Sequence, residues 1–200
     1  MAHEDPVPHG EVAEPEQEER LSPEERARRD AALKVIRKYG DPVLRSRALP
    51  IERFDAALHE EIRRMGRLMH DAHGIGLAAT QLGVMHRVLV YRVDPEADVA
   101  ALVNPVLEWA SEDTEALEEG CLSLPAVAVE VDRPVHVRVR AQDQHGEPML
   151  VEASHLEARV IQHEMDHLDG VLILDRTSRD QRKRAMRALR EALEAQAAAA

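Results

Sequence analysis

Two histidines and a glutamate near the end of the chain have the spacing of a metal site. His163, Glu164 and His167 form a His-Glu-x-x-His motif. On a helix, residues four apart leave from one face, so two neutral imidazoles could bind one divalent metal there. Glu164 would then lie beside the ion without binding it, where a carboxylate can take a proton from water. Paired surface histidines have the same spacing, so both interpretations are open for this motif alone.

The residues around this motif predict the helix that must position it. Good helix formers with apolar side chains at helical spacing precede the first histidine, and we expect the helix over about residues 154–168. Gly170 is its expected stop. A helix that carries two metal-binding imidazoles on one face would have to be buried.

Residues 73–83 form a second stretch of interest, in which two glycines flank one apolar residue and Gln81 follows. Neither a Gly-Lys-Ser/Thr sequence nor a preceding strand is present, which argues against a phosphate-binding loop. Glycine here would instead let another backbone approach closely, beside an amide that can donate a hydrogen bond. The alternative is a tight helix-to-strand turn with a surface glutamine.

Cys121, the only cysteine of the chain, lies next to a glycine in a third stretch, residues 118–125. A lone cysteine in a cytosolic protein is more often an inert buried thiol than a metal ligand. Its position alone therefore does not make it a ligand. A single cysteine also excludes an intrachain disulfide framework and fits a reducing cytosol.

The remaining pattern predicts an α+β fold, because the strands are grouped between helices and do not alternate with them. Ser22 and Pro23 predict the start of a short helix that runs to about Ala32. Apolar residues at helical spacing predict another helix over 55–72, which Asp55 could cap. Strands are expected over residues 33–36, 87–93, 101–107, 127–141 with a break at 132–134, and 149–152 after a hairpin turn at 144–147.

Length and charge set further limits. The 200 residues suit one domain with tails, and a net charge of −12 argues against a general nucleic-acid binder. Residues 1–32 carry ten acids and four bases, and we expect residues 1–20 to be disordered. Residues 176–200 carry seven bases and three acids. No apolar run approaches 18 residues, so we expect neither a membrane span nor a signal peptide.

Three stretches together resemble the signature motifs of the peptide deformylase family. They are Gly74-Ile75-Gly76-Leu77-Ala78-Ala79-x-Gln81, Glu119-Gly120-Cys121-Leu122-Ser123 and Gln162-His163-Glu164-x-x-His167. They occur in the family's order and at its spacing, and residues 39–44 resemble its N-terminal segment. One His-Glu-x-x-His motif is weak evidence, whereas the three motifs together are very specific.

The resemblance implies antiparallel β-sheets packed around a central metal-binding helix, followed by a C-terminal helix. It implies a catalytic domain over residues 33–175, between an acidic extension at 1–32 and a basic helix with an Ala-rich tail at 176–200. The implied activity is hydrolysis of the N-formyl group from the initiator methionine of nascent polypeptides. The resemblance further implies a cytoplasmic enzyme of the bacterial type, with neither a membrane nor DNA as partner.

The resemblance also implies the roles of individual residues. Cys121, His163 and His167 would hold one divalent metal with an open fourth position, Fe(II) in the cell, with Zn(II), Ni(II) or Co(II) able to substitute. Glu164 would be the acid and base, and the Gln81 amide and the Leu122 backbone N–H would bind the oxyanion. The substrate would add as a strand between two segments that include Gly74, Ile75, Gly76, Leu77, Glu119 and Gly120. Leu117, Leu156, Val160 and the His163 ring would line the methionine pocket.

Some positions depart from the family's pattern. Thr80 stands where proline is usual, Ala126 where glycine is common, and Ala128 where arginine is frequent. None of the three is a proposed ligand. The resemblance also predicts that Arg133 pairs with Asp166, which would fix the metal-binding helix against the sheet.

Two other functions stay open at this level. A zincin-type metallopeptidase needs a third ligand after the second histidine, and only Glu191 is a formal candidate. A non-catalytic, ribosome-associated relative would retain the metal without turnover. The basic C-terminal helix is either a solvated surface helix or a docking element for the ribosome.

Overall fold

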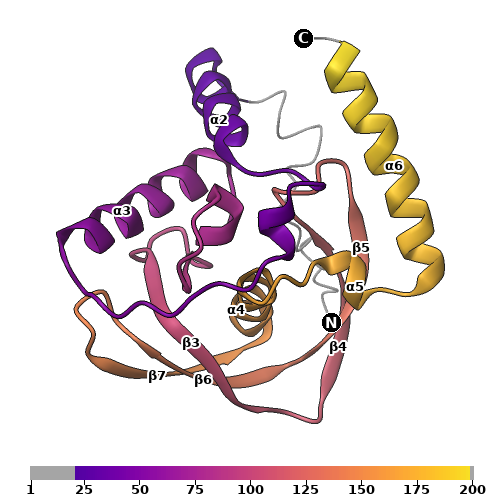
Figure 1. The fold of residues 1–200 in the computed structure, drawn as a ribbon. Coiled ribbons are helices and arrows are strands. Elements are labelled where there is room, and N and C mark those ends of the chain that lie inside the picture. The colour runs from indigo at the N-terminus through magenta and orange to yellow at the C-terminus, as the bar shows by residue number, and fades with distance from the viewer. Residues whose placement is uncertain (1–20, 199–200) are drawn as a thin grey trace, which may run out of the picture.

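The computed structural model describes residues 21–198, so the tail predicted for residues 1–20 lies outside the described part of the chain. Helices and antiparallel strands are mixed as the α+β prediction requires (Figure 1). The helices are α2 (Pro23–Val35), α3 (Ala56–Asp71), α4 (His155–Leu168), α5 (Ile173–Arg176) and α6 (Arg179–Ala198), with 3-10 turns η1 (Pro42–Arg45) and η2 (Ala79–Leu82). The strands are β1 (Gly76–Ala78), β2 (Val88–Tyr91), β3 (Ala100–Ala110), β4 (Thr114–Gly120), β5 (Ala128–Pro134), β6 (His136–Gln142) and β7 (Pro148–Ser154).

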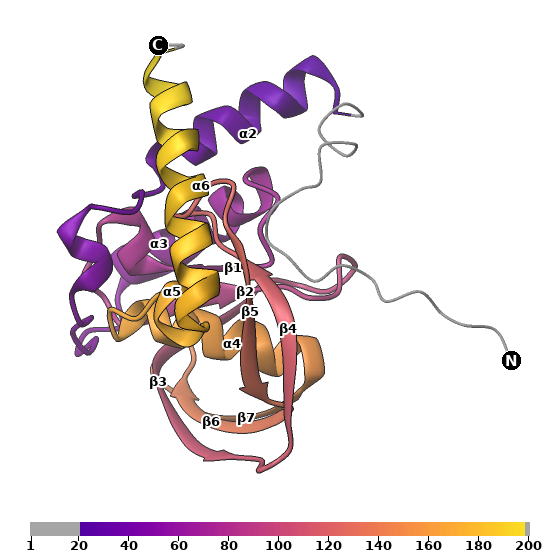
Figure 2. The same ribbon diagram turned by 90° about the vertical axis from the view of Figure 1, so that its right-hand side faces the viewer.

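The strands form two antiparallel sheets. The larger has five strands in the order β1-β2-β3-β6-β7, and the smaller is the β4-β5 hairpin. Helix α4 lies between the sheets, with the larger sheet below it in Figure 1 and the hairpin beside it in Figure 2. The central helix packed between antiparallel sheets, which the family resemblance implied, is therefore present.

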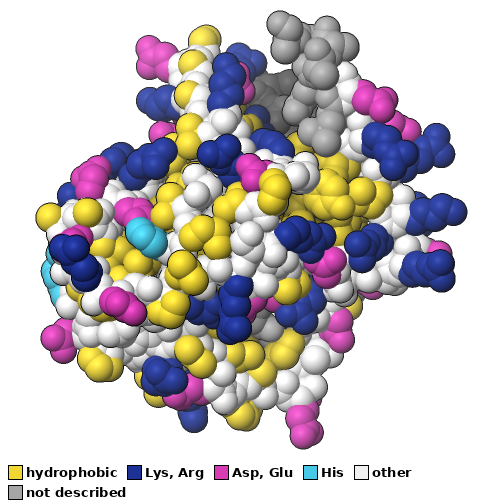
Figure 3. All heavy atoms as spheres, in the orientation of Figure 1, with side chains coloured by type: hydrophobic (Ala, Val, Ile, Leu, Met, Phe, Trp, Pro, Cys, Tyr) yellow, Lys and Arg dark blue, Asp and Glu magenta, His cyan; other side chains and the backbone are white. Residues whose placement is uncertain are grey.

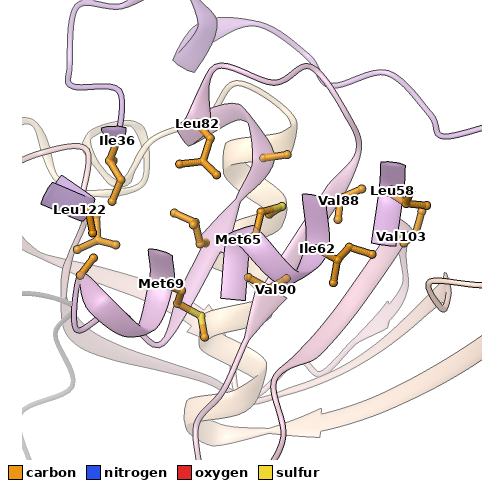
Figure 4. Close-up of a cluster of buried hydrophobic side chains, with 14 of the residues drawn as sticks. Ile36, Leu58, Ile62, Met65, Met69, Leu82, Val88, Val90, Val103 and Leu122 are labelled. Atoms are coloured by element: carbon orange, nitrogen blue, oxygen red, sulfur yellow. The ribbon is translucent and has the colours of Figure 1, made fainter. Parts of the chain in front are cut away.

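Strand β2 is buried on both faces, which explains its continuous apolar sequence. Val88 and Val90 pack against α3, in a cluster with Met65 and Met69 (Figure 4). Leu89 faces the other way, into the cluster that α4 shares with the sheet. By contrast, β6 alternates buried and exposed residues, because its outer face is open to solvent.

Helix α4 is buried around most of its circumference, as the sequence predicted for the helix that carries the motif. From Ala158 to Leu168 nearly every side chain is buried. Arg159 and His163 bond to Glu119 of β4, and Asp166 bonds to Arg133 of β5. The helix begins after Ser154 and ends at Leu168, and Gly170 follows at φ 73° as the expected stop.

The predicted caps are confirmed. The Asp55 carboxylate accepts hydrogen bonds from the backbone N–H groups of Ala57 and Leu58, at 3.0 and 3.2 Å, and starts α3. Ser22 and Glu25 form a reciprocal capping box at the start of α2.

Two predictions of secondary structure need correction. The strand predicted for residues 33–36 is wrong, because α2 continues to Val35 and places Ala32 and Ile36 on the face that packs on the α3 cluster. The helix expected to end near Ala32 therefore extends three residues further, to Val35. Strand β4 has no apolar alternation and was not predicted; it forms because all seven of its residues pair with β5.

The basic C-terminal helix predicted within residues 176–200 is α6, which begins at Arg179, because Arg176 belongs to the short helix α5. It buries Ala185 and Leu189 against β5 and α5, so this helix is packed onto the rest of the fold. Basic side chains cover its outer surface, on the right of the molecule in Figure 3. No helix in residues 21–198 is both long and apolar enough to cross a membrane.

Candidate metal centre

Three buried side chains from two distant parts of the chain converge on one point. Cys121 follows directly after β4, and His163 and His167 lie one turn apart on α4. One ligand atom from each lies within 4.8 Å of the others. Cys121 Sγ is 3.2 Å from His167 Nε2, so the thiol that could not be assigned from its own surroundings belongs to this cluster.

A hydrogen bond orients His163 for metal binding, and burial keeps His167 neutral. His163 Nδ1 lies 3.0 Å from Glu119 Oε2, which leaves Nε2 as the nitrogen available to a metal. Burial lowers the pKa of His167 well below its usual range and keeps that imidazole neutral. Although burial raises the pKa of Glu119, hydrogen bonds from His163 and Arg133 outweigh it and hold that pKa well below its usual range.

A buried ionic network anchors Glu119 and α4. Arg133 donates to Glu119 through Nε at 2.6 Å and Nη2 at 2.9 Å, and to Asp166 through Nη1 at 2.9 Å. The predicted Arg133–Asp166 pair is thus confirmed. Arg159 adds a bond of 2.6 Å to Glu119, and Arg176 adds two to Asp166. The network ties α4 to both strands of the hairpin through charge-assisted hydrogen bonds.

Glu164 is fully buried and lies against β1. A Cβ added at Gly76 would overlap the Glu164 carboxylate, and one added at Gly74 would come within 2.9 Å of Leu122. The sequence predicted that these glycines permit a close backbone approach. In the structure, Gly76 leaves space for the Glu164 side chain and Gly74 leaves space for the Leu122 side chain. The glycine motif therefore packs directly against the other two motifs.

Gln81 is completely buried, so the alternative of a surface glutamine is wrong. Its Oε1 accepts the Ala78 N–H at 2.9 Å, which fixes the orientation of the amide. Its Nε2 points at the cysteine segment, 3.2 Å from Ser123 Oγ and 3.8 Å from Cys121 Sγ. The amide donor therefore faces the same space as the three ligand atoms.

A pocket opens beside His163. It is lined by residues of β4 and α4 and by the residue before β1, namely Ile75, Glu119, Gly120, Leu156, Arg159, Val160 and His163. Leu117, which the resemblance placed in a methionine pocket, is half-buried and lies outside this set. Arg159 was not predicted. Its position four residues before His163 puts it on the same face of α4, which was the available signal.

The three departures from the family's pattern have structural counterparts. The Thr80 hydroxyl donates to the His167 carbonyl at 3.1 Å, a bond that proline could not make. Ala126 has a φ of 58°, a conformation that glycine adopts more readily. Ala128 lines a hollow between the hairpin and α6, together with Arg184 of that helix.

The donor set fits a catalytic divalent metal. One thiolate and two imidazoles are three protein ligands, and catalytic sites with three ligands leave a position for water or substrate. Sulfur and nitrogen donors suit Fe(II), Co(II), Ni(II) and Zn(II), and they do not suit Mg(II) or Ca(II). Glu164 is buried on the same helix as the two histidines and is not among the three residues whose ligand atoms converge.

Comparison with known proteins agrees with this geometry. The sequence profile of the family described as polypeptide deformylase matches residues 33–183. Peptide deformylases of Acidothermus cellulolyticus and Parafrankia sp. are 48% and 45% identical over 161 residues, which cover 80% of this chain and 88% and 87% of theirs.

Solved structures show the same similarity. A peptide deformylase from Synechococcus elongatus in complex with actinonin has a TM-score of 0.74 at 42% identity, covering 78% of this chain and 85% of its own. A peptide deformylase from Legionella pneumophila has a TM-score of 0.77 at 37% identity, covering 81% and 96%.

Proposed function

Because the chain belongs to the peptide deformylase family, an enzyme family that removes N-formyl groups, we propose that it deformylates the initiator methionine of nascent polypeptides with a divalent metal held by Cys121, His163 and His167. The observation that carries this proposal is the convergence of the three buried ligand atoms, with the Gln81 amide directed at Cys121. Glu164, which follows His163 on the same helix, is fully buried. A bound divalent metal would supply Lewis acidity, which polarises a carbonyl and makes water more acidic.

Glu164 is the proposed acid and base. Its carboxylate would take a proton from the attacking water as the water oxygen bonds to the formyl carbon. The same carboxylic acid would then deliver that proton to the amine nitrogen as the carbon–nitrogen bond breaks, which releases formate and the free methionyl amine. Complete burial of Glu164 supports this role, because it keeps the proton transfer away from bulk water.

Gln81 and Leu122 are the proposed donors to the oxyanion. The Gln81 amide already faces the ligand cluster, and its orientation is set by the Ala78 N–H. The Leu122 nitrogen follows Cys121 directly, so its N–H belongs to the segment that carries the thiolate. Removing one donor of this kind typically costs 10²–10³-fold in kcat, or roughly 3–4 kcal/mol.

The substrate would bind as an added strand between the segment of Gly74, Ile75, Gly76 and Leu77 and the end of β4 at Glu119 and Gly120. Strand β4 pairs with β5 along one edge only, which leaves its other edge for a peptide. The methionine side chain would enter the pocket beside His163, where Leu156 and Val160 supply apolar walls. Leu117 remains a proposed contact further along the strand.

The metal in the cell is proposed to be Fe(II), with Zn(II), Ni(II) or Co(II) able to replace it, because the donor set accepts all four. The enzyme would act in the cytoplasm, where nascent chains emerge from the ribosome.

We also propose that the exposed basic residues of α6 contact ribosomal RNA phosphate. Their exposure supports this, since the apolar side of the helix is already packed on the protein.

Formate release separates the candidate functions. Purified, metal-loaded protein is expected to release formate from formyl-Met-Ala-Ser and to leave acetyl-Met-Ala-Ser unchanged. A metallopeptidase would instead cleave internal bonds of an unblocked peptide, and a non-catalytic relative would do neither. Peptide cleavage without formate release would overturn the proposal.

A further inference from the structure

Three residues just after α2 run alongside both segments that carry the proposed oxyanion donors. The Arg37 N–H donates to the Gln81 carbonyl at 2.7 Å, and the Tyr39 N–H donates to the Ser123 carbonyl at 2.9 Å. Between them, Lys38 Nζ donates to the Leu122 carbonyl at 2.8 Å. Residues 37–39 therefore bridge two segments that lie about forty residues apart in the sequence.

This bridge closes a ring of contacts. Gln81 Nε2 reaches Ser123 Oγ at 3.2 Å, so the two donor segments also touch each other directly. Ile36, which directly follows α2, is buried in the same cluster as Leu122, and Figure 4 shows the two at the same end of it. The start of the bridge is thus anchored in the core next to the residue that it holds.

Lys38 is the only side chain of the bridge that makes one of these bonds, and it acts on the residue after the cysteine ligand. Its ammonium is half-buried, so its hydrogen bond to the Leu122 carbonyl is charge-assisted and only partly screened by water. The preceding carbonyl, of Cys121, accepts the Leu124 N–H at 2.9 Å. The two carbonyls that flank the Leu122 nitrogen are therefore both fixed, one of them by Lys38.

We propose that Lys38 is a positioning residue for deformylation. The Leu122 N–H shares its peptide plane with the Cys121 carbonyl, which the Leu124 N–H holds, and Lys38 holds the next peptide plane through the Leu122 carbonyl. With the planes on both sides of Leu122 fixed, its N–H keeps its direction toward the developing oxyanion. This inference rests on the proposed function. In this proposal Lys38 does not contact the substrate and acts only through Leu122. A donor displaced by a fraction of an ångström stabilises a transition state poorly, and a misplacement of about 1 Å can cost roughly 10²-fold in rate.

Such a role predicts an effect on kcat more than on KM. The oxyanion develops only in the transition state, so a misdirected N–H weakens catalysis while ground-state binding of the peptide stays nearly the same. A lysine that served stability alone would change the melting temperature and leave kcat of the folded enzyme unaltered. The two roles are therefore separable by kinetics at a temperature where all variants are folded.

The test compares Lys38→Met, Lys38→Arg and the control Lys34→Met, each loaded with zinc to the same metal content, on formyl-Met-Ala-Ser. Lys34 is exposed on α2, four residues earlier. We expect Lys38→Met to lower kcat roughly 10- to 100-fold with KM little changed. Lys38→Arg keeps a cationic donor and should retain most of the activity, and Lys34→Met should equal the wild type. A Lys38→Met enzyme with wild-type kcat would overturn the proposal.

If Lys38→Met does not fold, Lys38→Gln replaces it, because its amide is too short to reach the Leu122 carbonyl. A lowered kcat of Lys38→Gln would support the proposal, and a wild-type kcat would overturn it. The backbone amide resonance of Leu122 in the zinc enzyme gives a second readout. It should shift in the Lys38 variants that lose the bond and stay in place in Lys34→Met; an unmoved resonance would also contradict the proposal. Absence of formate release by the wild type would refute the proposed function instead, so the two failures are distinguishable.

Discussion

The carboxylate of Glu164 lies against the α-carbon of Gly76, in the space that the Cβ of any other residue would occupy. Gly76→Ala must therefore displace Glu164 or the strand β1. Because Glu164 is the proposed proton-transfer group, we expect formate release to fall by roughly 10²-fold or more while the metal content stays at the wild-type level.

Gly66→Ala is the matched control for that variant. Gly66 lies within α3, and an added Cβ would meet Val99 at 3.4 Å, an ordinary contact. Alanine in place of a helical glycine stabilises by up to about 1 kcal/mol, so this variant should keep full activity and a melting temperature at or above that of the wild type. Equal activity in the two alanine variants would show that the approach of Glu164 to Gly76 has no role in catalysis.

Cys121→Ser tests the sulfur ligand. Cobalt bound by a thiolate has absorption bands that depend on sulfur, and these should disappear in the serine variant. The metal should also dissociate more easily from it. The measurement is the visible spectrum of the cobalt-loaded protein together with metal retention during dialysis. An unchanged spectrum would remove Cys121 from the ligand set.

Arg133→Met tests the ionic network behind the ligands. Arg133 is 4% exposed and joins Glu119 to Asp166, so its loss leaves buried carboxylates with fewer partners. We expect unfolding free energy to fall by about 3–5 kcal/mol and metal affinity to fall roughly 10- to 100-fold. Denaturant unfolding and metal competition measure the two effects.

Arg138→Met is the control for the network. Arg138 pairs with Glu152 on the outer face of the sheet, where both side chains are largely exposed. Such a pair contributes about 0–1 kcal/mol, so this variant should unfold nearly as the wild type does and bind metal equally well. A loss of stability as small in Arg133→Met as in Arg138→Met would show that the buried network does not support the centre.

The site was more predictable from sequence than the elements around it. The spacing of His163 and His167 placed them on one helical face, whereas the role of Cys121 came from the resemblance and not from its surroundings. Strand β4 escaped prediction because its seven residues, Glu-rich with one large apolar side chain, have no strand periodicity. Its conformation depends on pairing with β5, a contact that no local pattern encodes.

At the end of α2 the local sequence favours a strand, but the structure has a helix. Val35 and Ile36 favour a strand by their branched side chains, but Ala32 and Ile36 are four apart and pack together on the α3 cluster. Tertiary packing therefore outweighs the local preference for a strand, and the helix continues to Val35. Arg159 was missed for a related reason: helical spacing gave its direction, but only the fold shows that Glu119 is there to pair with it.

Replacing exposed basic residues of α6 tests the proposed contact with the ribosome. Arg182, Lys183, Arg187 and Arg190 are exposed, so changing all four to glutamine should leave the fold and activity on a formyl-tripeptide intact. Co-sedimentation with ribosomes at low salt should decrease strongly, because the contact would be to phosphate. Deleting the helix is a poorer test, since Leu189 is buried in the core.

Arg63, Arg64 and Arg67 of α3 provide a control, because they are also exposed and basic but lie on another helix. Their replacement by glutamine should leave co-sedimentation unchanged. If both sets reduce it equally, or if the wild type never co-sediments, α6 is a surface helix without this role.

Glu164→Ala most directly tests the separation between the metal ligands and the catalytic carboxylate. The variant should bind one metal per chain with the same cobalt spectrum as the wild type, since Cys121, His163 and His167 are unchanged. Formate release from formyl-Met-Ala-Ser should fall by roughly 10²–10⁴-fold, because the acid and base are lost. A metal-loaded Glu164→Ala enzyme that releases formate at close to the wild-type rate would contradict the account.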